Sequence, residues 1–158
     1  MNDAVCDNDK TLAGLLGASP YFDALVADCD RLVANELQGR GMTVRTAVSM
    51  VKKLKPSIVE RTVRELMPDF LVALEPCHAD FKASAKPDAD FGDYLAARDT
   101  RVVDAVLEVA DHRAERVGSR PIRSAYARVR GRAAGEIRSV VPELARIIAR
   151  HRRRALAG

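Results

Sequence analysis

Apolar residues recur every three or four positions along most of the chain, which is the spacing of one face of an α-helix. Residues 22–37 show it clearly, with Phe22, Leu25, Val26 and Cys29 followed by more apolar residues at the same spacing. No run alternates apolar and polar residues over the length of a strand. The pattern predicts an all-α protein, a single-domain bundle of about six or seven helices around one core.

Start and stop signals set the expected helix boundaries. Ser19-Pro20 and Asp90 are typical of helix starts, whereas Gly39 and Pro56 are typical of helix ends. Pro68 and Pro76 are expected to break or kink the segments that contain them, because proline lacks a backbone donor. The expected helices span 20–38, 43–55, 57–74, 91–98, 99–117, 122–131 and 137–148, and residues 11–17 are a candidate for a further short helix.

The same signals divide the chain into three regions. Residues 1–10 are polar and without a cap, so we expect a disordered N-terminus. Residues 11–149 form the predicted helical domain. Residues 150–158 contain four arginines and no acid, and we expect a basic, partly mobile tail, exposed to solvent.

Composition limits the class of protein. A chain of 158 residues with 47% hydrophobic and 30% charged residues suits one soluble domain with a real core. No stretch of about 18 apolar residues predicts a transmembrane helix, and the polar start is unlike a secretory signal. Three cysteines without framework spacing favour a reduced, cytoplasmic chain.

Charge is distributed unevenly along the sequence. Residues 1–100 carry a net charge of −4, whereas residues 101–158 carry +8, and every base in the second region is arginine. Codon bias with a solvated surface is one explanation. Phosphate binding is the other, because the planar guanidinium group suits phosphate better than an ammonium group does.

The stretch EPCHAD, residues 75–80, places a thiol, an imidazole and a carboxylate together. Adjacent helical residues point about 100° apart, so Cys77 and His78 cannot converge on one small ligand within a helix. The C-x₂-C and H-x₃-H pairs of structural zinc sites are also missing from the sequence. We therefore expect a Pro-marked bend with Cys77 half-buried and His78 exposed, and no metal, cofactor or catalytic residue.

A charged residue falls within the apolar face of several predicted helices. Glu36 lies in the middle of the apolar arc of its helix, and Arg113 and Lys55 lie within the arcs of theirs. Because an unpaired buried charge is very costly, we expect Glu36 to be mostly buried and paired with Arg113, or with Lys55 as second choice. The alternative is a polar pocket between helices, with Glu36 as an acid or base and Tyr126 nearby.

Two groups of arginines are candidate anion sites. Arg130 and Arg132 flank Gly131. On the last helix the basic face is opposite the apolar face and consists of Arg146, Arg150, Arg153 and Arg154. Such a face is suited to non-specific contact with nucleic-acid phosphates, an anionic membrane surface or an acidic partner.

Five stretches of the sequence carry a resemblance to known proteins: VKKLKP (51–56), MPDFLVALEP (67–76), FGDYLAAR (91–98), VVDAVLEVADHRAER (102–116) and IRSAYARVRGRAAGEIRSVVPELARII (122–148). On these stretches, roughly from Arg31 to Ile148, the chain resembles a bacterial family of small all-helical proteins of unknown function. The resemblance implies the helical fold and implies no activity or cofactor.

Three functions are consistent with the sequence. The first is a helical interaction or scaffold protein without catalytic activity, which binds an unknown protein partner or itself. The second is non-specific binding of nucleic acid or an anionic surface through the Arg-rich C-terminal helix. The third is a small-ligand binder or enzyme with a polar pocket around Glu36.

Overall fold

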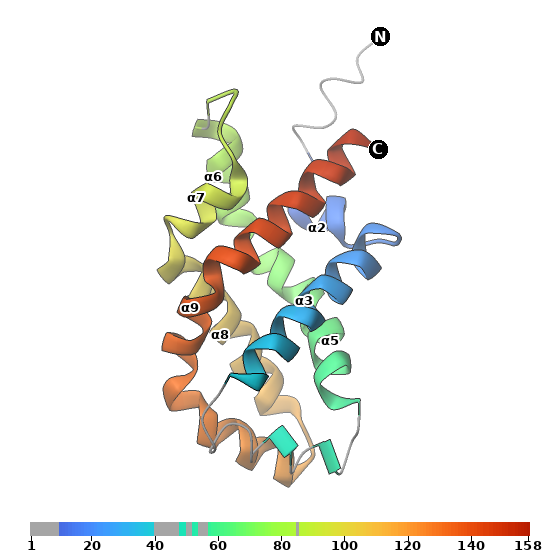
Figure 1. The fold of residues 1–158 in the computed structure, drawn as a ribbon, viewed down its shortest axis with the longest axis vertical. Helices are drawn as coiled ribbons and strands as arrows, with labels where there is room; N and C mark the ends of the chain where they lie inside the picture. Colours follow the sequence, from blue (N-terminus) through green and yellow to red (C-terminus); the bar gives the residue numbers. More distant parts are fainter. Residues whose placement is uncertain (1–9, 40–47, 50–51, 54–56, 85) are drawn as a thin grey trace.

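The computed structural model describes residues 10–39, 48–49, 52–53, 57–84 and 86–158. Within these ranges the chain forms seven helices that carry labels in Figure 1, and no strand. Their bounds are α2 Leu12–Leu16, α3 Tyr21–Gln38, α5 Ile58–Ala73, α6 Glu75–Ser84, α7 Phe91–Ala96, α8 Asp99–Arg116 and α9 Arg120–Ala157. The predicted all-α fold is confirmed.

Caps explain where several of these helices begin. The side chain of Thr11 accepts from the backbone N–H of Gly14 at the start of α2. The side chain of Asp90 accepts from the backbone N–H of Asp93 at the start of α7, as the sequence predicts. The helix predicted over 43–55 lies mostly outside the described residues.

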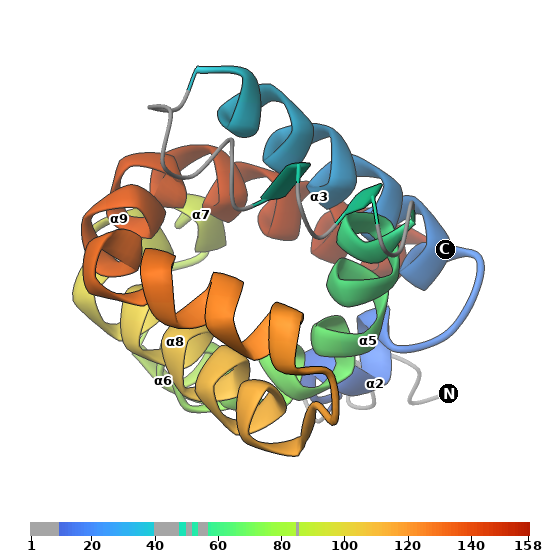
Figure 2. The ribbon, with the colours of Figure 1, turned by 90° about the horizontal axis from the view of Figure 1, so that it is seen from below.

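Four helices form a closed ring. In Figure 2, α3, α5, α8 and α9 surround the centre of the bundle. Contacts join α3 to α9, α9 to α8, α8 to α5 and α5 to α3, but no backbone contact crosses the ring between the described parts of α5 and α9. The short helices α2, α6 and α7 cover one end of this ring, where α2 and α7 also contact α9.

The last helix differs from its prediction. We expect one helix that ends near Gly131 and another from Ile137, but α9 is continuous over 38 residues. An interior glycine costs only about 1 kcal/mol of helix stability, which packing against α8, α3 and α7 outweighs. Pro142 lies inside α9, as Pro68 lies inside α5, and Figure 2 shows α9 bending along its course.

The core occupies only one half of the ring. The buried residues of the four ring helices come from the first half of α3 and α8 and the second half of α5 and α9, which all lie at the same end because neighbouring helices are antiparallel. Buried residues of α2, α6 and α7 complete the core there. Leu25, Leu71, Val102 and Ile148 are almost completely buried there. At the other end the apolar side chains of these four helices are only partly covered.

The C-terminal segment is also part of the fold. Residues 150–157 continue α9 to Ala157, His151 is 1% exposed, and Ala155 and Leu156 pack against the core. This differs from the expected exposed tail over 150–158. The reason is that His151, Ala155 and Leu156 share the segment with the arginines and are covered by the core, where α9 contacts α2, α3 and α7.

Candidate functional site

The partly covered end of the ring contains a groove made of three adjoining cavities. The inner cavity, of about 330 Å³, lies between α3 and α9 against Val106 of α8. The middle cavity, of about 350 Å³, lies between α3, α5 and α9. The two share Val33, Leu37 and Val129, so they lie side by side, and we call the two cavities together the apolar channel.

The walls of this channel are almost entirely aliphatic. The inner cavity is lined by Leu32, Ile137 and Val140, and the middle cavity by Val59, Val63 and Ile122. These side chains are partly buried, so the apolar surface is gathered between helices but is not filled by the described residues. A cavity of this size and lining is typical of ligand sites.

The third cavity has a different character. It holds about 430 Å³ between α5 and the turn from α8 to α9, and it shares Ile58, Thr62, Ile122 and Tyr126 with the middle cavity. Its remaining lining includes four arginines and one glutamate: Arg61, Arg113, Arg116, Arg123 and Glu65. We call this cavity the mouth of the groove.

The residues of the expected buried ion pair lie apart. Arg113 is about half exposed at the mouth and pairs with Glu65 of α5, not with Glu36. Glu36 is half-buried and lines the inner cavity together with Glu136, and both glutamates make further contacts within the chain. Lys55 lies outside the described residues. The sequence cannot distinguish Glu65 from Glu36 as the partner, because the choice depends on how α5 and α8 align.

Tyr126, which we expect near Glu36, binds a carboxylate of α8. Its hydroxyl donates to Asp111 of α8, and Arg130 binds both Asp111 oxygens at 2.7 and 2.9 Å. Burial raises the pKa of Tyr126, and the hydrogen bond to Asp111 adds to the effect. The hydrogen bond from Arg130 lowers the pKa of Asp111, with a further contribution from Tyr126. This cluster fixes α9 against α8 at the edge of the groove.

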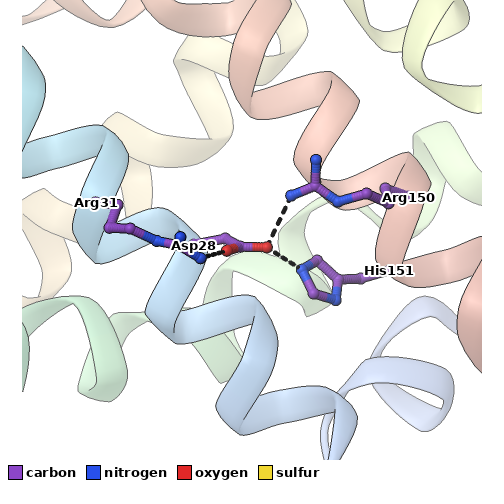
Figure 3. A network of polar contacts seen from close by, with 4 residues as sticks. All are labelled: Asp28, Arg31, Arg150 and His151. Carbon is purple, nitrogen blue, oxygen red and sulfur yellow. Dashed lines mark hydrogen bonds and ion pairs between the residues drawn. The ribbon is translucent and has the colours of Figure 1, made fainter.

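Asp28 of α3 is the centre of a second polar cluster, shown in Figure 3. Its Oδ2 lies 2.6 Å from Nε2 of His151 and 2.7 Å from a guanidinium nitrogen of Arg150, and Oδ1 accepts from Arg31. Burial raises the pKa of Asp28, but the hydrogen bonds from His151 and Arg150 outweigh it and hold the pKa below its usual range. Nδ1 of His151 is buried with no partner among the described residues, so a proton on Nε2 suits the site.

The EPCHAD stretch, residues 75–80, forms the first part of α6, and its side chains make structural contacts within the fold. Cys77 is 3% exposed and His78 is fully buried, whereas we expect a half-buried thiol and an exposed imidazole. Nδ1 of His78 lies 3.3 Å from Glu75, and Nε2 accepts from Nε of Arg152 at 3.0 Å. His78 becomes buried because α6 packs beneath α7, where its ring meets Phe91 edge-on.

The candidate anion-binding arginines of α9 mostly bind carboxylates of the chain itself. Arg146 pairs with Glu143 at 2.9 Å, Arg150 with Asp28 at 2.7 Å and Arg153 with Asp90 at 2.6 Å. Arg154 lines a surface depression beside Asp28, and Arg132 is exposed. Carboxylates of α9, α3 and the start of α7 therefore already bind three of the arginines that the sequence suggests for an external anion.

The described cysteines show no nucleophilic character. Burial raises the pKa of Cys29 to about 12 and also raises the pKa of Cys77. A thiol that stays protonated is a poor nucleophile and a poor metal ligand. Within the part of the chain that the structure describes, no group of three or more His, Cys, Asp or Glu side chains is placed to hold a metal ion.

Sequence reasoning missed the groove and both histidine contacts. Most residues that line the groove are ordinary aliphatic residues of amphipathic helices. The apolar spacing of such residues predicts that they are buried, and does not predict a cavity. The histidines lie 123 and 74 residues from their partners Asp28 and Arg152. Glu36 and Arg113 are groove residues with a signal, since each is a charge within an apolar face.

Among the described residues, no helix is both long and apolar enough to cross a membrane.

Comparison with known proteins places the chain in one family. No curated protein and no solved structure matches it. A family model, described as a family of unknown function (DUF6918), matches residues 12–152. This range includes α3, α5 and α8 completely and all of α9 except its last five residues. The chain therefore belongs to the DUF6918 family of unknown function.

Proposed function

We propose that this chain is a non-catalytic binding protein that takes up an apolar ligand in the groove between α3, α5 and α9. The observation that carries the proposal is the pair of adjoining aliphatic cavities at one end of a ring whose other end is tightly packed. Exposing gathered apolar surface is unfavourable, and ligand burial would recover about 25 cal/mol for each Å² covered.

Two further observations support binding rather than catalysis. The described thiols are buried with raised pKa values, and His78 and His151 are held in contacts between helices. This proposal unites the interaction protein with the small-ligand alternative around Glu36, which lines the inner cavity. Nucleic-acid binding gains no support, because Arg146, Arg150 and Arg153 are already paired.

The test uses a neutral apolar dye, N-phenylnaphthylamine, whose fluorescence rises on entering an apolar site. Ala125→Phe and Ala133→Phe fill the middle and inner cavities respectively. We expect each substitution to weaken dye binding about ten-fold. The new phenyl ring occupies space that the dye would fill, so the dye loses apolar contacts worth several methylene groups. Circular dichroism establishes that each variant is folded.

Ala127→Phe is the matched control, because Ala127 lies on the same helix, is exposed and lines no part of the groove. It should bind the dye like the unaltered protein. Absence of dye binding by the unaltered protein, or equal loss in Ala127→Phe, would overturn the proposal. Self-association, the other form of interaction that we expect from the sequence, is tested separately by light scattering.

A further inference from the structure

We infer that the ligand of the groove is a single-chain amphiphile with an anionic head, a long-chain carboxylate, whose tail fills the channel and whose head meets the arginines of the mouth. This inference rests on the proposed function and deepens it. It depends on two properties of the groove that lie next to each other: an aliphatic channel and a basic mouth.

The mouth has a surplus of positive charge. Arg113 is paired with Glu65. Arg61, Arg116 and Arg123, by contrast, form no ion pair with any residue in the described ranges. A guanidinium group binds a carboxylate through two parallel N–H donors, which gives both affinity and orientation.

The channel suits a long, unbranched tail. The inner and middle cavities meet at Val33, Leu37 and Val129, and the middle cavity meets the mouth at Ile58, Ile122 and Tyr126. The three spaces therefore follow one another, from an apolar interior to a charged opening. A compact apolar ligand would fill one cavity and leave the others, whereas a flexible chain fills them in sequence.

The polarity of the groove fixes the direction of the ligand. The four arginines gather at the mouth, whereas the inner end is lined by Glu36 and Glu136, which make contacts of their own within the chain. The lining of the inner end is almost purely apolar and includes no base among the described residues, so an anionic head there would lose its hydration without gaining a partner. At the mouth it faces the surplus of guanidinium groups, so charge complementarity places the head there.

The experiment measures displacement of N-phenylnaphthylamine from the full-length protein by three ten-carbon amphiphiles that differ in head charge: decanoate, decanol and decyltrimethylammonium. We expect decanoate to displace the dye at the lowest concentration. Arg116→Glu and Arg123→Glu should each weaken displacement by decanoate about ten-fold, the size of one charge-assisted contact, and leave displacement by decanol nearly unchanged.

Arg128→Glu is the matched control, because Arg128 is an exposed arginine of α9 outside all parts of the groove and the change in net charge is the same. It should leave all three amphiphiles unaffected. If it weakens decanoate as much as Arg123→Glu does, the effect is one of net charge and the inference fails.

The other outcomes separate this inference from the proposed function. Equal displacement by decanol and decanoate, or stronger displacement by decyltrimethylammonium, would overturn the anionic head while the apolar groove stands. Dye binding that none of the three amphiphiles displaces would overturn the single-chain ligand. A protein that does not bind the dye would overturn the proposed function itself.

Discussion

Single side chains hold the C-terminal part of α9 in place. Arg150 and His151 bind Asp28 of α3, Arg152 binds His78 of α6, and Arg153 binds Asp90 at the start of α7. Consecutive residues of a helix point about 100° apart, so four successive side chains reach three different elements. Residues 150–153, which the sequence predicts to be part of an exposed basic tail, thus join α9 to three other elements.

At the residue scale, we predict that His78 makes stability fall as the pH decreases. Burial lowers the pKa of His78, although Glu75 opposes this, so its folded pKa lies below the ordinary value of about 6.5. As the pH falls, the unfolded chain therefore binds the proton at a higher pH than the folded chain does. The contribution of the neutral ring to stability is complete above about pH 6.5 and is lost as the pH falls toward the folded pKa. Protonation also removes the acceptor that Nε2 offers to Arg152.

The measurement is the free energy of unfolding by urea between pH 5 and pH 8. His78→Gln should flatten the pH dependence in the window below about pH 6.5. His112→Gln is the control, since the side chain of His112 is 72% exposed, and it should keep the profile of the unaltered protein. A profile of His78→Gln that runs parallel to that of the unaltered protein would show that His78 does not cause the dependence.

At the scale of an element, α9 shows how packing overrides local sequence signals. The sequence predicts a junction between Gly131 and Ile137, yet the helix continues through Gly131 and Gly135. A Cβ at either position would meet nothing within 4 Å, so both glycines face open space. Gly92 of α7 is different, because a Cβ there would lie 2.8 Å from Oδ1 of Asp90 and 3.2 Å from the backbone oxygen of Ala145 in α9.

We therefore predict opposite effects of the same substitution. Gly131→Ala and Gly135→Ala should each stabilise the protein by about 0.5–1 kcal/mol, because alanine loses less conformational entropy in a helix. Gly92→Ala should destabilise it, because the new methyl group disturbs the Asp90 cap and the approach of α7 to α9. Thermal unfolding checks all three; a destabilised Gly131→Ala would mean that a junction does exist there.

At the scale of the whole molecule, the ring of four helices is tightly packed at one end, whereas at the other end the described residues leave a groove between the helices. The C-terminal part of α9 belongs to the packed end, where it contacts α2, α3 and α7. The N-terminal part of the same helix lines the open groove. One helix thus connects the end that provides stability with the end that we propose binds a ligand.

Deleting His151–Gly158 should lower the melting temperature by about 10 °C or more. The deletion removes a buried histidine, two arginine contacts and the packing of Leu156, a loss of at least about 3 kcal/mol. This reverses the expectation of an expendable tail. Deletion of only Ala157 and Gly158, which are both exposed, is the control and should have little effect. Equal melting temperatures for the longer deletion and the unaltered protein would contradict the packed arrangement.

The fold was largely predictable, because periodicity is a local property. The apolar spacing of residues 22–37 and the cap at Asp90 identify α3 and α7 from neighbouring residues alone. The exceptions, such as the continuation through Gly131 and the burial of His78, depend on what packs against the segment. Of the candidate site, sequence identified Glu36, Arg113 and Arg130 as charges of interest, but Arg113 binds Glu65 and not Glu36, and Arg130 binds Asp111 of the chain itself.

The sequence by itself determined that this chain is helical, where most helices begin and which face of each is apolar, since these follow from spacings of four residues or fewer. Only the tertiary structure decided which charges meet and where the apolar faces fail to close. Asp28 with His151, and Arg152 with His78, join residues far apart in the chain. The groove likewise exists because α5 and α9 lie on opposite sides of the ring, and the distance between two helices is set by everything packed around them.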